Sequence, residues 1–358
     1  MKLKASIILG NGESQLRFAL TQIAGLPLIT RNLLTLHKMG YRELYLTLPK
    51  NFAAKVKKAI QSDLQLRKVK VHFLSEQTSD LNETYDLEVA ADAFIDEKLP
   101  TPHFLVTLDS QDKVKVIEAK LLENIRQSTP GPVAKHLNKR ISLPISLQLA
   151  KWGMHPHAVS MFNIIVGFST GIFVSVGQYW AYLLGAFLFQ MASVFDGCDG
   201  ELAKLRFRTS KQGEYLDSIS DNGALLSFFI GLSFAFAKQH SFALTFQLGL
   251  FLFSGLGLLF WQMISFLKKY TQSASLVAFH KEYLDKLDFS KSPLLGVIVK
   301  YGKILMRKDC FSLAFFFFAL FGMLPWLFYI AASALWMTNF VLIRIKTIPE
   351  FAFKKVSE

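Results

Sequence analysis

Four aspartates occur close together in the sequence, at or inside stretches apolar enough to cross a membrane: Asp196, Asp199, Asp217 and Asp221. Asp196 and Asp199 have the i, i+3 spacing on one predicted helix, and Asp217 and Asp221 have the i, i+4 spacing on the next, so each pair projects from one helix face. A charge in the middle of a bilayer costs at least about 3 kcal/mol. Acidic residues in such positions therefore usually serve a site.

Two antiparallel helices joined by a short basic loop bring the four carboxylates together. Carboxylates at such distances repel one another unless a divalent cation neutralises them, and an all-oxygen ligand set suits Mg²⁺ or Mn²⁺ rather than Zn²⁺. Small residues are interleaved at positions that face the same space: Gly200, Ala203 and Gly213. They allow a flat base and a diphosphate to approach the backbone. A metal-bound diphosphate beside a carboxylate base is the machinery of phosphoryl transfer.

The full spacing is Asp196-x2-Asp199-Gly200-x2-Ala203-Lys204-x8-Gly213-x3-Asp217-x3-Asp221. It resembles the signature of the CDP-alcohol phosphotransferases, D-x2-D-G-x2-A-R-x8-G-x3-D-x3-D. The resemblance implies that Asp196, Asp199 and Asp217 bind Mg²⁺ or Mn²⁺, as two ions, together with the CDP diphosphate. It implies that Asp221 ligates the second metal and deprotonates the acceptor hydroxyl, and that the nucleotide lies against Gly200, Ala203, Lys204 and Gly213. Helix capping accounts for one or two of these aspartates, but not for four at these spacings.

The sequence departs from the signature at Lys204, which replaces the family's Arg. A lysine keeps the positive charge but loses the planar, two-pronged grip on phosphate, so we expect weaker nucleotide binding unless Arg206 or Arg208 compensates. A weaker match is the segment His155–Ser160, which resembles the family's Pro-Asn-x-x-Thr turn before the first membrane helix, with His157 in place of the Asn.

The resemblance implies transfer of a substituted phosphate group from a CDP-alcohol to an acceptor hydroxyl, with release of CMP, in phospholipid biosynthesis. At least one substrate is then a lipid, and the family is commonly a homodimer. The basic residues Arg140, Arg307 and Lys308 are candidates for binding an anionic acceptor, although residues at such boundaries also anchor to lipid headgroups. The motif is shared by enzymes with different donors and acceptors, so it does not identify either one.

The elements that must position these residues are apolar helices. The chain has 358 residues, 51% of them hydrophobic, with 34 Phe and a mean hydropathy of +0.31. About six stretches approach the ~20 residues that a transmembrane helix needs: Val159–Val176, Trp180–Phe195, Leu216–Ala237, Phe242–Leu267, Cys310–Met323 and Trp326–Ile343. The basic, amphipathic segment before them, residues 131–157, is predicted to lie along the membrane interface, with a solvent-exposed linker helix as the alternative.

The net charge of +13 falls mainly in the apolar half of the chain. Basic residues cluster between the second and third apolar stretches, in the segment Lys268–Lys308 and after the sixth stretch. The positive-inside rule therefore predicts that the N-terminal domain and the C-terminus are cytoplasmic. Because this charge flanks membrane-length segments, anionic lipid is a better partner for it than nucleic acid.

Residues 1–130 alternate short β-rich runs with amphipathic stretches, which predicts a Rossmann-like parallel α/β domain before the all-α membrane domain of 158–345 and a cytoplasmic tail of 346–358. The segment Ile7–Gly12 resembles the opening of sugar-phosphate nucleotidyltransferases. The family's Arg after the glycine turn is missing, and Phe18 stands where its downstream Lys is expected. Asp109 is either a metal ligand or a helix N-cap.

We interpret this domain as a degenerate, inactive nucleotidyltransferase. The alternative for this domain is an active one, which makes the protein a bifunctional enzyme of the inositol-phosphate type that also activates its own alcohol with CTP. The alternative for the whole protein is a non-catalytic membrane scaffold. Metal-dependent CMP release separates an enzyme from a scaffold or a transporter.

Overall fold

The computed structural model describes residues 3–75, 85–96, 104–270, 302 and 307–347. Most of the predicted basic segment Lys268–Lys308, and the predicted tail from residue 348 onward, lie outside the described residues. The chain divides into two compact units, which are described separately below. The first consists of Met1–Ser128, Leu143–His155 and Glu201–Thr209, and the second of Thr129–Ser142, Pro156–Gly200 and Ser210–Glu358.

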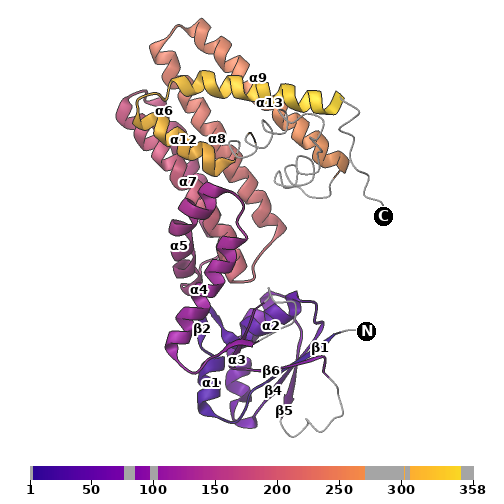
Figure 1. Ribbon diagram of the computed structural model, residues 1–358. Coiled ribbons are helices and arrows are strands. Elements are labelled where there is room, and N and C mark those ends of the chain that lie inside the picture. Colours follow the sequence, from indigo (N-terminus) through magenta and orange to yellow (C-terminus); the bar gives the residue numbers. More distant parts are fainter. Residues whose placement is uncertain (1–2, 76–84, 97–103, 271–301, 303–306, 348–358) are drawn as a thin grey trace. The chain divides into compact units, whose positions relative to one another are not determined.

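The first unit is built on a parallel sheet with the strand order β5-β4-β1-β6 (Figure 1). Ile7, on the central strand β1, is in register with Leu46 on one side and Val89 on the other, and all three are buried. Helices pack against this sheet because strands of a parallel sheet need cover on both faces. The predicted parallel α/β region is therefore confirmed. Its elements are β1 Lys4–Ile8, α1 Glu13–Ala19, β2 Gln22–Ile23, β3 Leu26–Pro27, α2 Leu28–Lys38, β4 Glu43–Leu48, α3 Lys50–Leu66, β5 Val71–Ser75, β6 Leu87–Ala90, β7 Ala93–Ile95, β8 Phe104–Thr107 and α4 Gln111–Gln127.

After β6 the chain departs from a simple alternation of parallel strands and helices. Strand β8 pairs antiparallel with β7 instead of extending the main sheet, and β2 and β3 form a separate two-stranded pair. Helix α2 is buried along almost its whole length. Its Asn32 donates a hydrogen bond to the Ala93 carbonyl (2.6 Å) and accepts one from the Ile95 amide (3.2 Å). These bonds join α2 to β7 and satisfy polar groups that would otherwise be buried without partners.

The second unit is helical. Each of the six predicted apolar stretches forms a helix, and a π-helical turn and one further helix precede them. The helical elements from residue 134 onward are η2 Ala134–Asn138, α5 Lys139–Lys151, α6 Pro156–Ser175, α7 Tyr179–Leu205, α8 Lys211–Gln239, α9 Phe242–Tyr270, α12 Lys308–Leu320 and α13 Trp326–Thr347.

Five of these helices, α6, α7, α8, α9 and α13, are long and apolar enough to cross a membrane. They indicate a multi-pass integral membrane protein. Helix α12 has 13 residues, which at 1.5 Å per residue gives about 20 Å, less than the ~30 Å hydrocarbon core. The described residues therefore contain five helices of spanning length, where the sequence predicted about six.

Small residues bring α6 and α8 close together. A Cβ added to Gly167 would lie 2.7 Å from the Cβ of Ala224, and one added to Gly171 would overlap the Ser227 carbonyl. Gly231 faces Gly171 in the same way. Such contacts allow two helix backbones to approach closely inside a membrane, where no hydrophobic effect holds helices together. The position of α8, and of the acidic residues on it, is set by this seam.

Aromatic rings join α7, α8 and α12. The ring of Phe189 on α7 lies 5.0 Å from that of Phe228 on α8 and 5.6 Å from that of Phe315 on α12, measured between centroids. Phe228 and Phe315 are themselves 5.0 Å apart. Contacts at these distances are typical of aromatic pairs in cores. This cluster packs α12 against the middle of α7 and of α8.

Candidate metal and substrate site

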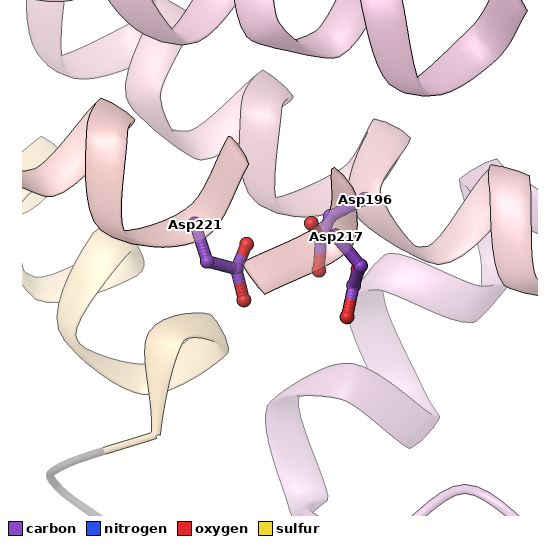
Figure 2. A group of neighbouring side chains, drawn as sticks. All are labelled: Asp196, Asp217 and Asp221. Atoms are coloured by element: carbon purple, nitrogen blue, oxygen red, sulfur yellow. The ribbon is translucent and has the colours of Figure 1, made fainter. Parts of the chain in front are cut away.

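Three of the four motif aspartates converge. Asp196 on α7 and Asp217 and Asp221 on α8 each offer a carboxylate oxygen, and these oxygens lie within 4.8 Å of one another. Figure 2 shows the three side chains gathered between the two helices. The convergence follows from helical spacing within α8 and from the packing of α8 against its neighbours. Helical spacing alone predicted that each pair of aspartates shares a helix face. The structure shows that Asp196 on one helix meets Asp217 and Asp221 on the other.

Asp199 lies one turn further along α7 and is 8% exposed. Its carboxylate accepts hydrogen bonds from the Ser160 hydroxyl (2.5 Å) and from the Gly200 amide (2.6 Å). Within the described residues, Asp199 is not among the carboxylates that meet within 4.8 Å. Its role as a metal ligand stays a prediction.

An amide on α6 holds the aspartate cluster from the side. Asn163 is 1% exposed, and its Nδ2 lies 3.4 Å from Asp196 Oδ1 and 3.0 Å from the Ser220 hydroxyl. The Oδ1 atom of Asn163 is buried without a hydrogen-bond partner among the described groups. A buried carbonyl oxygen without a partner is costly, so a water molecule or a ligand is expected beside it.

A lysine from α12 balances the negative charge. Lys308 Nζ donates a hydrogen bond to Asp221 and lies 3.2 Å from Asp196 Oδ1. The Lys308 side chain is 13% exposed, and those of Asp196 and Asp221 are 21% and 34% exposed. One ammonium group therefore bridges carboxylates from two different helices.

The donor set fits a hard divalent cation. Three carboxylates and a nearby amide oxygen are the oxygen ligands that Mg²⁺ and Mn²⁺ prefer, and among the described residues this cluster contains neither the sulfur nor the imidazole that favours zinc. The carboxylates are partly buried, so their mutual repulsion is less screened than in water. A cation in their midst removes that repulsion.

Residues 153–327 match the family of CDP-alcohol phosphatidyltransferases. This part of the chain is a CDP-alcohol phosphatidyltransferase domain. The converging aspartates lie inside the matched residues.

Relatives with curated names match over shorter stretches. The chain is 34% identical over 129 residues to the "bifunctional IPC transferase and DIPP synthase" of Thermococcus kodakarensis, which is 36% of this chain and 29% of that protein. It is 29% identical over 115 residues to the protein of the same name from Archaeoglobus fulgidus (32% and 22%). It is 29% identical over 136 residues to that of Aquifex aeolicus (37% and 30%). The chain thus spans less than a third of the length of each of these relatives.

Within the CDP-alcohol phosphatidyltransferase domain, the small residues of the motif differ in what surrounds them. A Cβ added to Gly200 would meet nothing within 4 Å, whereas one added to Gly213 would lie 3.3 Å from the Ser210 hydroxyl. Ser210 is the N-cap of α8 and accepts a hydrogen bond from the Gly213 amide at 3.1 Å. Packing within the protein therefore explains the glycine at 213 in part, but it does not explain the glycine at 200.

The last turn of α7 carries the remaining nucleotide candidates. Ala203 is half-buried and Lys204 is exposed. The basic group in this turn lies where a helix C-terminus favours positive charge. The structure leaves the predicted nucleotide contacts of both residues as predictions.

The three acceptor candidates occupy different surroundings. Arg140, on α5, is exposed. Arg307 is the N-cap residue of α12, and its guanidinium binds the chain itself, donating to Asp309 Oδ1 (3.2 Å) and to the Pro130 carbonyl (2.6 Å). Asp309 in turn accepts a hydrogen bond from the Ala134 amide (2.7 Å). Of the three candidates, Lys308 lies at the aspartate cluster.

The glycine turn of the α/β unit is filled by its own chain. A Cβ added to Gly10 would overlap the Gln15 amide, and a shallow pocket there is lined by Ile8, Gly10, Gln15, Glu88, Val89 and Ala90. Asp109 accepts a hydrogen bond from Lys113 at 2.5 Å. This bond lowers the pKa of the exposed Asp109 carboxyl. It ties Asp109 to the first turn of α4 as a local ion pair.

Two residues at the site, Ser160 and Asn163, had no role assigned to them from the sequence. Ser160 ends the turn that resembles the family's Pro-Asn-x-x-Thr, and Asn163 follows it with the i, i+3 spacing. A polar pair on one face of an otherwise apolar helix is the signal that identifies them, since buried polar groups in membrane helices face partners.

Proposed function

We propose that this protein is a metal-dependent CDP-alcohol phosphotransferase that moves a substituted phosphate group to an acceptor hydroxyl and releases CMP. The observation that carries the proposal is the convergence of Asp196 with Asp217 and Asp221 inside a domain of this family. Three carboxylates gathered at the ends of membrane helices are costly without a cation. A phosphoryl-transfer site needs that cation, since a diphosphate is itself anionic.

Asp196, Asp199, Asp217 and Asp221 hold Mg²⁺ or Mn²⁺, as two ions, in this proposal. Bound there, the metal neutralises the diphosphate and makes its phosphorus more electrophilic. Gly200, Ala203, Lys204 and Gly213 form the nucleotide-binding face. The open space at Gly200 supports this assignment, because helix packing in the protein does not require a glycine there.

Asp221 accepts the proton of the acceptor hydroxyl, the oxygen attacks the β-phosphorus in line, and the bond from that phosphorus to the oxygen bridging it to CMP breaks. The proton ends on Asp221, and CMP leaves with the electron pair of the broken bond. In the structure Asp221 accepts a hydrogen bond from the ammonium of Lys308. The Lys308 ammonium occupies the Asp221 carboxylate in the structure, so in this proposal Lys308 turns to the phosphate when the acceptor hydroxyl takes its place at Asp221.

The finer topology belongs to the same proposal. Helix α12 crosses the bilayer as a sixth, short span, and the N-terminal domain and the C-terminus are cytoplasmic, in keeping with the basic residues between α7 and α8. At least one substrate is a lipid drawn from the bilayer, Arg140 and Arg307 line the approach of an anionic acceptor, and the protein acts as a homodimer. The segment 131–157 lies along the interface.

The α/β unit is catalytically inactive in this proposal. The Gln15 amide occupies the place beside Gly10, and Glu88 lines the same pocket, where a carboxylate opposes a bound phosphate. The second candidate is a bifunctional enzyme, and what favours it is the printed name of the relatives. The two are separated by supplying CTP and inositol phosphate and looking for pyrophosphate release.

The test is CMP release by the purified protein in detergent, with Mg²⁺ or Mn²⁺ and a panel of CDP-alcohols and acceptors. Asp221→Asn should abolish release, and EDTA should do the same to the wild type. Asp112→Asn is the matched control, because the Asp112 side chain is 94% exposed on α4, and it should leave release unchanged. A wild type that neither binds CMP nor releases it from any donor would overturn the proposal in favour of a scaffold.

A further inference from the structure

The connection between α7 and α8 folds as part of the α/β unit. Residues Glu201–Thr209, which lie in sequence between the two pairs of aspartates, group with Met1–Ser128. Phe207 packs against the hydrophobic core of the parallel sheet and has a φ of 51°. This left-handed conformation is unfavourable for a bulky residue and persists only where the surroundings hold it. The connection is therefore fixed and not merely a link.

Arg31 holds the last turn of α7. It lies on α2 and is 2% exposed, and its Nη2 donates to the Leu205 carbonyl (2.8 Å) and to the Ile23 carbonyl (2.9 Å). Its guanidinium carbon also lies 5.5 Å from the centre of the Phe207 ring. Leu205 is the last residue of α7, where carbonyl groups lack partners within the helix and carry partial negative charge. A buried guanidinium supplies both the donor and the opposite charge.

Arg67 holds the next residue with two donors. It is the C-cap residue of α3, and its Nε and Nη2 lie 3.1 Å and 2.8 Å from the carbonyl oxygen of Arg206. Its Nη1 donates to Asp63 Oδ1 at 2.9 Å, which fixes the guanidinium plane. Only arginine offers this fork, so lysine at position 67 preserves at most one of the two bonds.

A second set of bonds ties the same connection to α5. Arg206 is 7% exposed, and its Nη1 donates to the Ala150 carbonyl (3.1 Å). Glu201, 2% exposed, accepts a hydrogen bond from the Ser146 hydroxyl at 2.6 Å. The connection is thus bonded on two sides inside the α/β unit, with Glu201 and Arg206 buried.

These groups act on the aspartates through α7 itself. The helix is continuous from Tyr179 to Leu205, so Leu205 is about 9 Å along the axis from Asp199 at 1.5 Å per residue. Reacting groups must be placed to within about 0.5 Å, and a misplacement of about 1 Å can cost a hundredfold in rate. A helix held at its end by two arginines moves less at Asp199 and Asp196, which are about two turns away at 3.6 residues per turn.

We propose that Arg31 and Arg67 are positioning residues for the phosphotransferase: they grip the α7–α8 connection, so that the α/β unit sets the geometry of the aspartate site without doing chemistry of its own. The expected effect on kcat rests on the proposed function. The expected effect on structure does not rest on it: Arg31 and Arg67 keep the connection ordered.

The experiment compares Arg67→Gln and Arg67→Lys with Arg42→Gln in the full-length protein in detergent. Arg42 is an exposed arginine of the same unit and serves as the control. Three quantities are measured: the kcat and KM of CMP release, Mn²⁺ affinity by electron paramagnetic resonance, and hydrogen exchange of the amides of 202–209. We expect kcat to fall about tenfold or more in Arg67→Gln, with a smaller loss in Arg67→Lys and little change in KM for the donor. Exchange at 202–209 should accelerate in the same order.

Unchanged kcat and Mn²⁺ affinity in Arg67→Gln, together with faster exchange, would overturn the inference, because the grip would then be structural only. If Arg67→Gln does not fold, Arg67→Lys decides in the same way. If the wild type releases no CMP from any donor, the proposed function fails, but the Mn²⁺ affinities still test whether Arg67 positions the aspartates. Weaker Mn²⁺ binding in Arg67→Gln than in Arg42→Gln supports the positioning role, and equal binding overturns it.

Discussion

Lys308, the first residue of α12, donates a hydrogen bond to Asp221 on α8 and lies 3.2 Å from Asp196 on α7. The contact joins three helices through one positive charge. Two ionised carboxylates from different helices repel each other side by side, and a cation between them offsets that repulsion. In this structure the ammonium group provides that charge at the place where we propose that a divalent metal binds.

Lys308→Met should destabilise the protein when metal is withheld. Removing one partner of a buried charge pair costs about 3–5 kcal/mol. Because the Asp221 side chain is 34% exposed, we expect about 1–3 kcal/mol, scaled down from that range for solvent screening. Thermal unfolding in EDTA and in Mg²⁺ measures the effect. The loss in Tm should be large in EDTA and small in Mg²⁺, since the metal then balances the carboxylates.

Lys238→Met is the control for that substitution. Lys238 is also a lysine of the helical unit, but in the described contacts it donates to backbone carbonyls, those of Ser175 (2.8 Å) and Val176 (3.3 Å). Its replacement should change Tm equally with and without metal. An equal loss in both conditions for Lys308→Met as well would show that Lys308 and the metal do not share a site.

Gly200→Ala should separate folding from nucleotide binding. The added methyl group meets nothing within 4 Å, and alanine favours a helix over glycine by about 1 kcal/mol. Tm should therefore stay or rise, while the affinity for CMP falls at least about tenfold, equivalent to 1.4 kcal/mol, because the methyl group occupies the nucleotide's approach. Calorimetric titration with CMP in Mg²⁺ measures this.

The comparison is Gly171→Ala, where the methyl group would overlap the Ser227 carbonyl of α8. Here Tm should fall, since overpacking costs about 1–3 kcal/mol. Full CMP affinity in Gly200→Ala would remove this glycine from the nucleotide site.

Local spacing explains what the sequence could predict. The helix period alone places Asp217 and Asp221 on one face of α8, and runs of apolar residues alone predict α6 to α9. The alternation of β-rich and amphipathic stretches predicted the parallel sheet. The antiparallel pairing of strand β8 with β7 was not predictable in this way, because a short strand carries no local signal for parallel or antiparallel pairing.

The contacts between helices have a weaker signal in the sequence than the helices themselves. Lys308 reaches Asp221 because an aromatic cluster seats α12 beside α8, and nothing in the residues next to Lys308 specifies that packing. The grip of Arg31 on Leu205 joins residues 174 positions apart in the sequence. Such pairs depend on the tertiary fold. The glycines of the α6–α8 seam, Gly167, Gly171 and Gly231, are the kind of small residues that indicate close packing of membrane helices.

Ser160→Ala should weaken the site through Asp199. The Ser160 hydroxyl donates to the Asp199 carboxylate at 2.5 Å and is 1% exposed. Losing a partner that orients a metal ligand typically costs about 10–100-fold in metal affinity or activity. We therefore expect a higher Mg²⁺ concentration for half-maximal CMP release. Ser169→Ala is the matched control, because the exposed Ser169 hydroxyl bonds only to its own helix at the Ile165 carbonyl (2.8 Å) in the described contacts. Equal Mg²⁺ dependence in the two variants would place Asp199 outside the metal site.

Asp217→Asn should change stability in opposite directions with and without metal. Asp217 lies with Asp196 and Asp221 in a group of carboxylates whose oxygens are within 4.8 Å of one another. Neutralising one of three like charges relieves repulsion, so Tm in EDTA should rise. The same change removes a ligand, so the stabilisation by Mn²⁺ should shrink. For the wild type that stabilisation is about 2.7 kcal/mol at a metal concentration of 100 times Kd. Thermal unfolding over a Mn²⁺ series gives both quantities, with Asp112→Asn on α4 as the reference. If the Mn²⁺-dependent rise in Tm were as large in Asp217→Asn as in the reference, Asp217 would not be a ligand, and the three carboxylates would need another explanation.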